Sequence, residues 1–553
     1  LVQGHLLSIA AGRSVQAYAL MAASAAIGLA IGHEIARRWA SRLPPLPGSA
    51  LAWAGIGASL ALASAHWNDL PEFFGAYMAY PLVHNFGARE AVRGTVCALM
   101  LMPAAVFAGM ARALSTRGAS SPAGTATGIA LHAAGGAVGA LAAGLWLLPA
   151  FGGILGAQVL TLIAVAAAVA TALLLLAGPE TAGLRPWRLP TLGASLAAGL
   201  LAWACGGWPL DPAQQGAAAH AFFVRQDWGR TIDSAERFGD GLSTVTVSAG
   251  ERPVKQLLVN GRFRGNDQWT GETQTQTAFT LAALLHQDRR GSALAVGYGT
   301  GLTARILKDA GFQRLDLADA DTSAVALADR HFDSLNRGVS RLPGVTMSDL
   351  SARGALRAAS KAGTAYDLIL VDEPALWFAG AADAFNREFY QLALRRLSAQ
   401  GVLAQRISLS RQAPSELLAI IATLRESFPQ VSLYAMGSQG LLVATADRER
   451  ALPMTAALAR LERESTLAPV LAALGRSPLT LPNDRLLGPA GVDVFLHDTG
   501  LPPVFWASTD DNLHLEFGTP RGNVLDADES LKGNLKVLER YRGVQGASRE
   551  ETR

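Results

Sequence analysis

Long apolar stretches dominate the first 210 residues of the chain, and no other feature constrains its fold as much. They cover residues 15–32, 49–66, 91–114, 124–151, 153–177 and 190–208. Crossing a bilayer takes about 20 largely apolar residues in a helix, because backbone polar groups cannot stay unpaired in hydrocarbon. We therefore predict a multi-pass α-helical membrane domain over residues 1–210 with about six spans. Residues 73–86 are a candidate seventh span.

Composition changes near residue 210. Up to Trp208 the chain is rich in Ala, Leu and Gly and contains no Lys, whereas beyond Asp211 charges of both signs are mixed. A chain of 553 residues also exceeds what one core usually organises. Because Leu1 is not Met and no basic segment with a cleavage site follows, we expect a trimmed start rather than a signal peptide.

Charge and cysteine content exclude several functions. The net charge is only +3, and no basic tract is interleaved with aromatic residues, so we expect no nucleic-acid partner. Cys97 and Cys205 both lie in apolar runs, which favours buried inert thiols over a disulfide or a metal pair. We expect no metal. The expected partners are the lipid bilayer and a small-molecule ligand, and whether the chain forms a homodimer stays open.

The side of the membrane that the C-terminal half faces stays open. Arginines follow the first, third and fifth stretches, so the positive-inside rule places those loops in the cytoplasm. Six spans would then place the C-terminal half outside, and a seventh would reverse this. The fourth stretch, rich in Gly and Ala at spacings of three and four, predicts close helix packing.

The soluble half begins with extended segments and continues with alternating strands and helices. Residues 219–275 predict a small β-domain, because 242–249 alternate and GERP supplies a turn before 254–263. Residues 276–450 predict a parallel sheet covered on both faces, and 451–553 a packing extension that is helical at first and then irregular. Helices are expected at 279–286 and 387–401. The expected strands are 293–297, 314–318, 344–347, 366–371, 401–407, 431–434 and 440–444.

A glycine-rich loop follows the first of these strands. It reads Val296-Gly297-Tyr298-Gly299-Thr300-Gly301 and leads into the helix LTARILKDAG. Glycines at 297, 299 and 301 allow a tight turn, so that backbone amides can approach a ligand at the helix N-terminus.

Carboxylates follow the next strands, where open parallel sheets bind ligands. Asp319 can accept both hydroxyls of an adenosyl ribose, and Asp349, in Ser348-Asp349-Leu350, can accept the adenine amino group. Asp372 and Glu373 lie beside the reacting centre, while Asp321 is more suited to capping the next helix. Because the loop 297–303 carries no Arg or Lys, we expect an acidic pocket that attracts a sulfonium and amines rather than phosphates.

These residues resemble the spermidine/spermine synthase (aminopropyltransferase) family over about residues 223–448. The segments that carry the resemblance are LLVNGRF, AVGYGTGLT, LADAD, YDLILVDEP, FNREFYQLALRRLSAQGVL and STDDNLHLEF. The whole chain is similar to bacterial fusions of a major-facilitator-like membrane region with such a domain. The resemblance implies a Rossmann-like α/β domain of the S-adenosylmethionine methyltransferase/spermidine synthase type in the bacterial inner membrane. It also implies S-adenosylmethionine or its decarboxylated form as co-substrate, and a polyamine as an acceptor.

By that resemblance, Gly297, Tyr298, Gly299, Thr300 and Gly301 line the cofactor. Asp319 and Asp321 would bind its ribose side, Asp349 and Leu350 its adenine, and Asp372 its sulfonium side or the incoming amine. Asp372 is the first candidate for the general base and Glu373 the second.

The sequence departs from the family pattern at three places. The segment after Asp372 lacks a second aspartate, unless Glu373 replaces it. Thr300 stands where soluble synthases carry an aspartate. A Tyr-and-acid stretch is replaced by Thr275-Gln276-Thr277, where Gln276 could contact substrate or be structural.

Three functions remain open. The first is an enzyme that releases 5'-methylthioadenosine, by aminopropyl-type transfer to an amine or by internal attack within the co-substrate. The second is an S-adenosylmethionine-dependent methyltransferase. The third is a transporter or sensor whose soluble part binds a ligand without altering it. Cofactor supply favours a cytoplasmic soluble domain, whereas the loop charges favour the outside.

Overall fold

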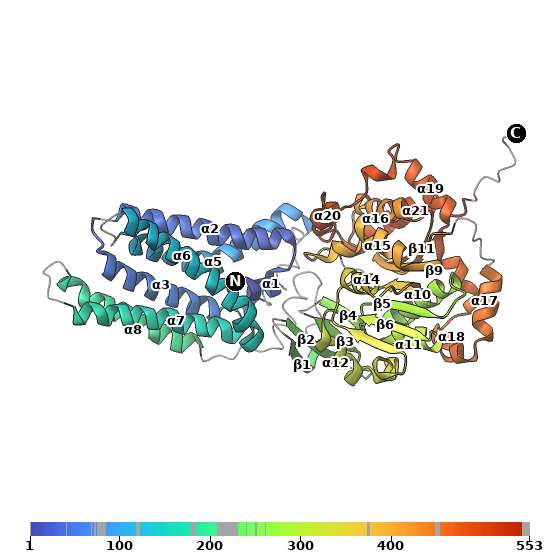
Figure 1. The fold of residues 1–553 in the computed structure, drawn as a ribbon, viewed down its shortest axis with the longest axis horizontal. Helices are drawn as coiled ribbons and strands as arrows, with labels where there is room; N and C mark the ends of the chain where they lie inside the picture. Colours follow the sequence, from blue (N-terminus) through green and yellow to red (C-terminus); the bar gives the residue numbers. More distant parts are fainter. Residues whose placement is uncertain are drawn as a thin grey trace. The chain divides into compact units, whose positions relative to one another are not determined.

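A computed structural model describes most of the chain (Figure 1). The described ranges are 2–39, 41–67, 69–70, 73–74, 84–117, 122–178, 184–206, 230–238, 241–248, 251–259, 262–372, 376–447 and 454–544. The chain divides into two compact units, 1–226 with 237–242, and 227–236 with 243–553. Each unit is described by itself.

Up to Gly206, the described residues of the first unit are helical. Its helices are α1 (Val2–Ala11), α2 (Val15–Arg38), α3 (Pro45–Ala65), α5 (Phe86–Ser115), α6 (Pro122–Ala142) with η2 (Ala143–Leu147), α7 (Leu148–Ala177), η3 (Arg185–Trp187) and α8 (Arg188–Gly206). Five segments of the described residues are long and apolar enough to cross a membrane: Val15–Arg38, Pro45–Ala65, Phe86–Ser115, Ala126–Gly153 and Leu155–Ala177. The expected sixth span coincides with α8, which is not among these five. The candidate seventh lies mostly outside the described residues.

Glycines set two features of this unit. Gly152 (φ 70°, ψ 176°) breaks the helix between the fourth and fifth candidate spans. A Cβ on Gly32 of α2 would lie 1.8 Å from the Val106 carbonyl oxygen, and one on Gly109 of α5 would lie 2.2 Å from that of Leu29. The backbones of α2 and α5 therefore touch where Gly is required. The described residues do not show the close packing expected of the fourth stretch, because none of their atoms lies within 4 Å of a Cβ built on Gly135, Gly136, Gly139 or Gly144.

The second unit begins with an antiparallel sheet of four strands in the described residues, ordered β1-β2-β3-β4. These are β1 (Arg230–Phe238), β2 (Gly241–Ser248), β3 (Lys255–Val259) and β4 (Arg262–Asn266). The alternating run predicted as a strand forms β2, and the extended segment after the turn forms β3 and β4. Val245 of β2 and Leu257 of β3 pair with each other and belong to the same buried core as α10 and α11, so this sheet packs on the rest of the unit through an apolar face.

The larger sheet has the order β12-β10-β11-β9-β8-β5-β6-β7. Its strands are β5 (Ser292–Val296), β6 (Arg314–Ala318), β7 (Val345–Ser348), β8 (Tyr366–Val371), β9 (Leu397–Ser408), β10 (Gln430–Met436), β11 (Gln439–Thr445) and β12 (Arg485–Leu487). Strands β5 to β9 are parallel, whereas β10 and β11 form an antiparallel hairpin whose strand β11 pairs with β9. The prediction of an all-parallel sheet is therefore wrong at this edge.

Strand order reverses between β5 and β8, because the chain passes outward through β6 and β7 and then returns. The loops after β5 and β8 diverge at this point, and open sheets bind ligands in the resulting crevice. The amide of Asp372, after β8, donates to the Val296 carbonyl of β5 at 2.9 Å. The glycine loop and Asp372 thus begin next to each other, at the ends of β5 and β8.

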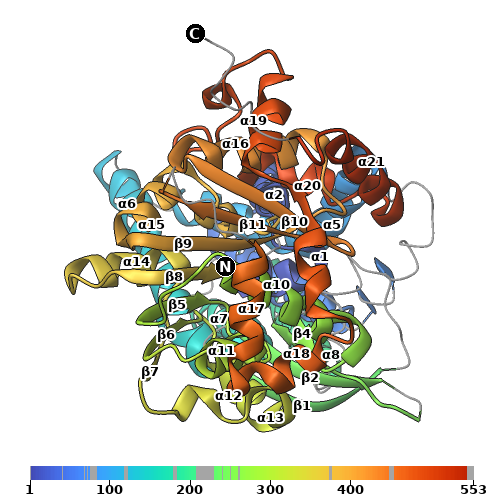
Figure 2. The same cartoon turned by 90° about the vertical axis from the view of Figure 1, so that its right-hand side faces the viewer.

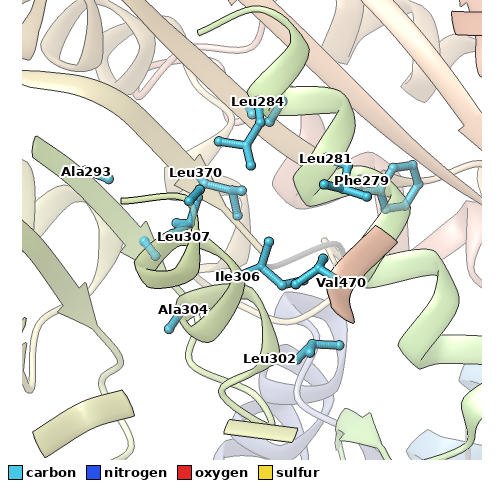
Figure 3. Close-up of a cluster of buried hydrophobic side chains, with 14 of the residues drawn as sticks. Phe279, Leu281, Leu284, Ala293, Leu302, Ala304, Ile306, Leu307, Leu370 and Val470 are labelled. Atoms are coloured by element: carbon cyan, nitrogen blue, oxygen red, sulfur yellow. The ribbon is translucent and has the colours of Figure 1, made fainter. Parts of the chain in front are cut away.

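Helices cover both faces of the sheet (Figure 2). One face carries η4 (Trp269–Thr273), α10 (Gln274–Leu285), α11 (Leu302–Asp309), α12 (Thr322–His331), α13 (Asp333–Asn336), η5 (Val339–Arg341), α17 (Met454–Arg463), η7 (Ser465–Leu467), α18 (Ala468–Ala473) and η8 (Pro478–Asp484). The other carries α14 (Ala352–Lys361), η6 (Ala381–Ala384), α15 (Arg387–Arg396), α16 (Pro414–Ser427), α19 (Pro489–His497), η9 (Pro503–Phe505), α20 (His514–Gly522) and α21 (Ala527–Glu539). Figure 3 shows Leu281 and Leu284 of α10 beside Ile306 and Leu307 of α11.

Two expectations need correction. The helix expected over 387–401 ends at Arg396, because β9 begins at Leu397, which pairs with Tyr366 of β8. The tail is not irregular beyond its first helix: β12 extends the sheet edge, and α19 to α21 cover the face. Asp510 accepts hydrogen bonds from both terminal nitrogens of Arg353, at 2.5 and 2.9 Å, which fixes the STDDN segment against α14.

Candidate functional site

The glycine loop, residues 297–301, has the tight geometry that the sequence predicts. All three glycines have positive φ, of 85°, 53° and 82° in chain order. A Cβ on Gly299 would lie 2.9 Å from the Arg264 carbonyl oxygen, and one on Gly301 would lie 2.6 Å from the Asn336 Cβ. The loop is thus pressed between β4 and the end of α13, and it tolerates no side chain at either position.

Two side chains of the glycine loop point away from solvent. Tyr298 is 5% exposed, and its hydroxyl donates to Asp329 at 2.5 Å. Burial, reinforced by the Asp329 carboxylate, raises the pKa of Tyr298 far above its ordinary value. Thr300 is 1% exposed, and its hydroxyl has no hydrogen-bond partner among the described residues.

Asp319 lies directly after β6 and is 4% exposed. Its Oδ2 accepts from the Tyr298 amide at 2.9 Å and from the Arg264 guanidinium at 2.5 Å, while its Oδ1 accepts from the Asp321 amide at 3.0 Å. A carboxylate offers about four acceptor positions, so about one remains. Asp319 thus keeps acceptor capacity for a ribose hydroxyl, and the expectation that it accepts both hydroxyls stays a prediction.

Asp321 caps α12, as its sequence position favours. Its carboxylate accepts from the Ala324 amide at 3.1 Å and from the Ser323 hydroxyl at 2.7 Å. Ser243 of β2 donates to it at 3.3 Å, so the small sheet is tied to this helix terminus. Asp321 thus has a structural role, and its acceptor positions are largely used.

The residues after β7 lie at the edge of the parallel strands. Asp349 is exposed, and its carboxylate makes no hydrogen bond to the described residues. Leu350 is half-buried and packs on the core of the α14 face. The Asp319 amide donates to the Ser348 carbonyl at 3.1 Å, which brings the tips of β6 and β7 together.

Asp372 belongs to a cluster that the sequence did not reveal, the Arg406 cluster of Arg406, Glu272 and Asp372. The guanidinium of Arg406 donates to Asp372 Oδ1 at 3.1 Å and lies 2.7 Å from Glu272 Oε1. All three side chains are at most 15% exposed. Burial lowers the pKa of Arg406, but the Asp372 and Glu272 carboxylates outweigh it, so its pKa is raised.

Gln276 of α10 lies next to the glycine loop. It is 5% exposed. A Cβ on Gly265 would lie 2.8 Å from Thr300 Cγ2 and 3.9 Å from Gln276 Nε2. These distances bring β4, the loop and α10 together, so Gln276 can reach a ligand that rests on the loop. Glu373, the second candidate base, lies outside the described residues.

The site carries less negative charge than its strand-tip acids alone predict. Arg264 neutralises Asp319, and Arg406 lies between Glu272 and Asp372. The two cations, from β4 and β9, reduce the expected negative charge but do not remove it, because three acids stand against them. Within the described residues, no cluster of three or more His, Cys, Asp or Glu side chains could hold a metal ion.

Comparisons with known proteins identify a partial relative. No family model matches the chain. A stretch of 137 residues is 31% identical to a polyamine aminopropyltransferase of Corynebacterium efficiens. It covers 25% of this chain and 26% of that protein, so the chain spans about a quarter of the length of the curated relative it matches. Part of the chain is thus homologous to a spermidine-synthase-like protein, while the fusion with a major-facilitator-like region stays a prediction.

Solved structures provide only distant likenesses. Spermidine synthase from Thermotoga maritima has a TM-score of 0.35 at 13% identity, over 44% of this chain and 87% of that one. Spermidine synthase with the transition-state analogue AdoDATO has a TM-score of 0.34 at 13% identity, over the same shares. Human methyltransferase-like protein 13 with SAH has a TM-score of 0.30 at 17% identity, over 36% of this chain and 92% of that one. With TM-scores below 0.5, these likenesses establish neither substrate nor reaction.

Proposed function

We propose that the second unit binds an adenosyl sulfonium, S-adenosylmethionine or its decarboxylated form, and is a membrane-bound transferase that releases 5'-methylthioadenosine. The observation that carries the proposal is the pairing of the glycine loop with Asp319. The Tyr298 amide donates to Asp319 at 2.9 Å, which holds the loop after β5 against the tip of β6, next to the point between β5 and β8 where strand order reverses. Homology of one stretch to a polyamine aminopropyltransferase supports the reaction class.

The proposed chemistry is a displacement at carbon. A nucleophile, an amine or a group of the co-substrate itself, attacks the carbon beside the sulfonium. The carbon–sulfur bond breaks, its electron pair passes to sulfur, and methylthioadenosine leaves as a neutral thioether. If the nucleophile is an amine, its proton passes to Asp372, whose Oδ1 is oriented by Arg406 at 3.1 Å. The contribution of the site is then mainly orientation.

Product analysis tests this proposal. The detergent-purified full chain is incubated with each co-substrate, with and without polyamines, and the nucleosides are identified by mass. We expect methylthioadenosine; S-adenosylhomocysteine would instead establish a methyltransferase. A bound co-substrate that survives long incubation unaltered would favour a transporter or sensor.

A substitution at Asp372 tests the assignment of the base. Asp372→Asn keeps the shape of the side chain but removes its charge and basicity, so we expect turnover to fall by a factor of about 100 or more. Asp333→Asn on exposed α13 is the matched control and should turn over like the unmodified protein. Equal rates in both variants would remove Asp372 from the reaction.

A further inference from the structure

Three segments far apart in the chain build the Arg406 cluster. Glu272 comes from η4 before α10, Asp372 follows β8, and Arg406 lies near the end of β9. In the strand register Val371 pairs with Gln405, so Asp372 and Arg406 follow a matched pair at the same sheet edge. One guanidinium therefore contacts both acids beyond the carboxyl ends of β8 and β9.

The side chain of Arg406 is held in place by the groups around it. Strand β9 is flanked by β8 and β11, and the Arg406 side chain is 7% exposed. Its guanidinium carbon lies 5.8 Å from the centre of the Phe279 ring of α10, which restricts it further. Its Nε is buried and has no hydrogen-bond partner among the described residues. A buried N–H without an acceptor costs free energy, so the cluster has an unused donor beside two carboxylates.

The charges of the cluster sum to one negative charge, from two carboxylates and one guanidinium. The other buried acid of the site, Asp319, is balanced by Arg264 at 2.5 Å. The Arg406 cluster therefore offers a positive and a negative group side by side. An α-amino acid head, which carries an ammonium and a carboxylate, complements such a pair.

The two forms of the co-substrate differ at this end. S-adenosylmethionine has a sulfonium, an ammonium and a carboxylate, and so a net charge of +1. The decarboxylated form lacks the carboxylate and carries +2, and its aminopropyl tail offers nothing to a guanidinium. We propose that the Arg406 cluster selects the carboxylate-bearing form, S-adenosylmethionine, with Arg406 facing the carboxylate and Glu272 facing the ammonium, while Asp372 keeps its role toward the attacking amine. This inference rests on the proposed function.

Calorimetry on the intact, detergent-purified protein tests the selection with three probes: S-adenosylmethionine, its decarboxylated form, and methylthioadenosine, which has no charged tail. S-adenosylmethionine should bind about tenfold more tightly than the decarboxylated form, or better. Arg406→Gln should remove or reverse this preference while leaving methylthioadenosine affinity within about twofold. Arg289→Gln, at an exposed position, is the control and should keep the preference.

Glu272→Gln provides a second variant in case Arg406→Gln does not fold. It removes one negative charge, so the dication should lose more affinity than S-adenosylmethionine, and the preference should widen. Equal or tighter binding of the decarboxylated form by the unmodified protein overturns the selection, while binding of methylthioadenosine keeps the proposed function. If none of the three probes binds, the proposed function fails and the selection fails with it.

Discussion

Asp319 combines structural and binding roles, and the two can be separated. The Asp319→Ala substitution removes the carboxylate that lies 2.5 Å from the Arg264 guanidinium, whose side chain is 9% exposed. It also removes the acceptor of the Tyr298 amide. Breaking a buried ion pair on one side costs about 3–5 kcal/mol. We expect a lower Tm together with loss of adenosyl-ligand binding in calorimetry.

The double variant Asp319→Ala, Arg264→Met is the control for this prediction. It removes the buried charge as well as its partner, so much of the lost stability should return, whereas ligand affinity should not. Recovery of affinity in the double variant would show that Asp319 acts on the ligand only through the fold.

The buried carboxyl group of Glu416 should make the free energy of unfolding depend on pH. It is 4% exposed at the start of α16, and burial raises its pKa to about 7, although the amides of Ala413 and Gly522 donate to its carboxylate. Since the folded state binds the proton more tightly than the unfolded state, the stabilisation is fully present below the ordinary pKa near 4.5. This stabilisation, about 3 kcal/mol in the free energy of unfolding, is lost as the pH rises to about 7.

The variant Glu416→Gln isolates this contribution, because it cannot titrate. We expect the free energy of unfolding of the unmodified protein to fall between pH 4 and pH 8. In the variant it should fall less steeply. Parallel curves would place the titration elsewhere. Glu416 contacts α20 through Gly522, so its ionisation bears on the attachment of the C-terminal extension.

At the scale of elements, the glycine loop depends on a close approach rather than on glycine conformation alone. Gly301 and Gly311 have similar φ values of 82° and 88°. A Cβ on Gly301 would lie 2.6 Å from Asn336 Cβ and 2.8 Å from the Tyr298 hydroxyl, whereas one on Gly311 has open space. Gly311→Ala should cost about 1 kcal/mol, from left-handed strain alone. Gly301→Ala should cost clearly more and abolish ligand binding.

Paired unfolding curves and calorimetry of the two variants check this prediction. Their backbone strain is nearly matched, so the difference between them reports the contact between the loop, Asn336 and Tyr298. If both variants lost similar amounts of stability and ligand affinity, backbone strain rather than the close approach would explain the need for glycine at position 301.

At the scale of the whole molecule, the number of spans determines which side the soluble part faces. Five described segments qualify as spans, and α8, with 19 residues, does not. With the arginine-bearing loops in the cytoplasm, an odd number of spans would place the C-terminal half there too and an even number would place it outside; we propose the cytoplasmic side. A charged adenosyl sulfonium does not cross hydrocarbon readily, so this side also agrees with ligand supply.

Cysteine labelling in intact cells checks this sidedness. In a background of Cys97→Ala and Cys205→Ala, Asp511→Cys places one thiol at an exposed position of the soluble part. We expect a membrane-impermeant thiol reagent to react with it only after permeabilisation. Labelling of intact cells would mean that the chain crosses the membrane an even number of times from an external N-terminus, or an odd number of times from a cytoplasmic one.

The strands of the nucleotide-type sheet, the glycine loop and the strand-tip acids follow from the sequence alone, because local hydrophobic pattern and turn chemistry encode them. The pairings at the site are not local. Arg264 lies 55 residues before Asp319, and Arg406 lies 34 residues after Asp372, so each pair forms only when the sheets assemble. The only hint in the sequence is a charged residue within an otherwise apolar strand, Arg406 in GVLAQRISL. Tertiary structure therefore decided the charge of the site, since it brings Arg264 to Asp319 and Arg406 to Asp372 as these acids lose contact with water.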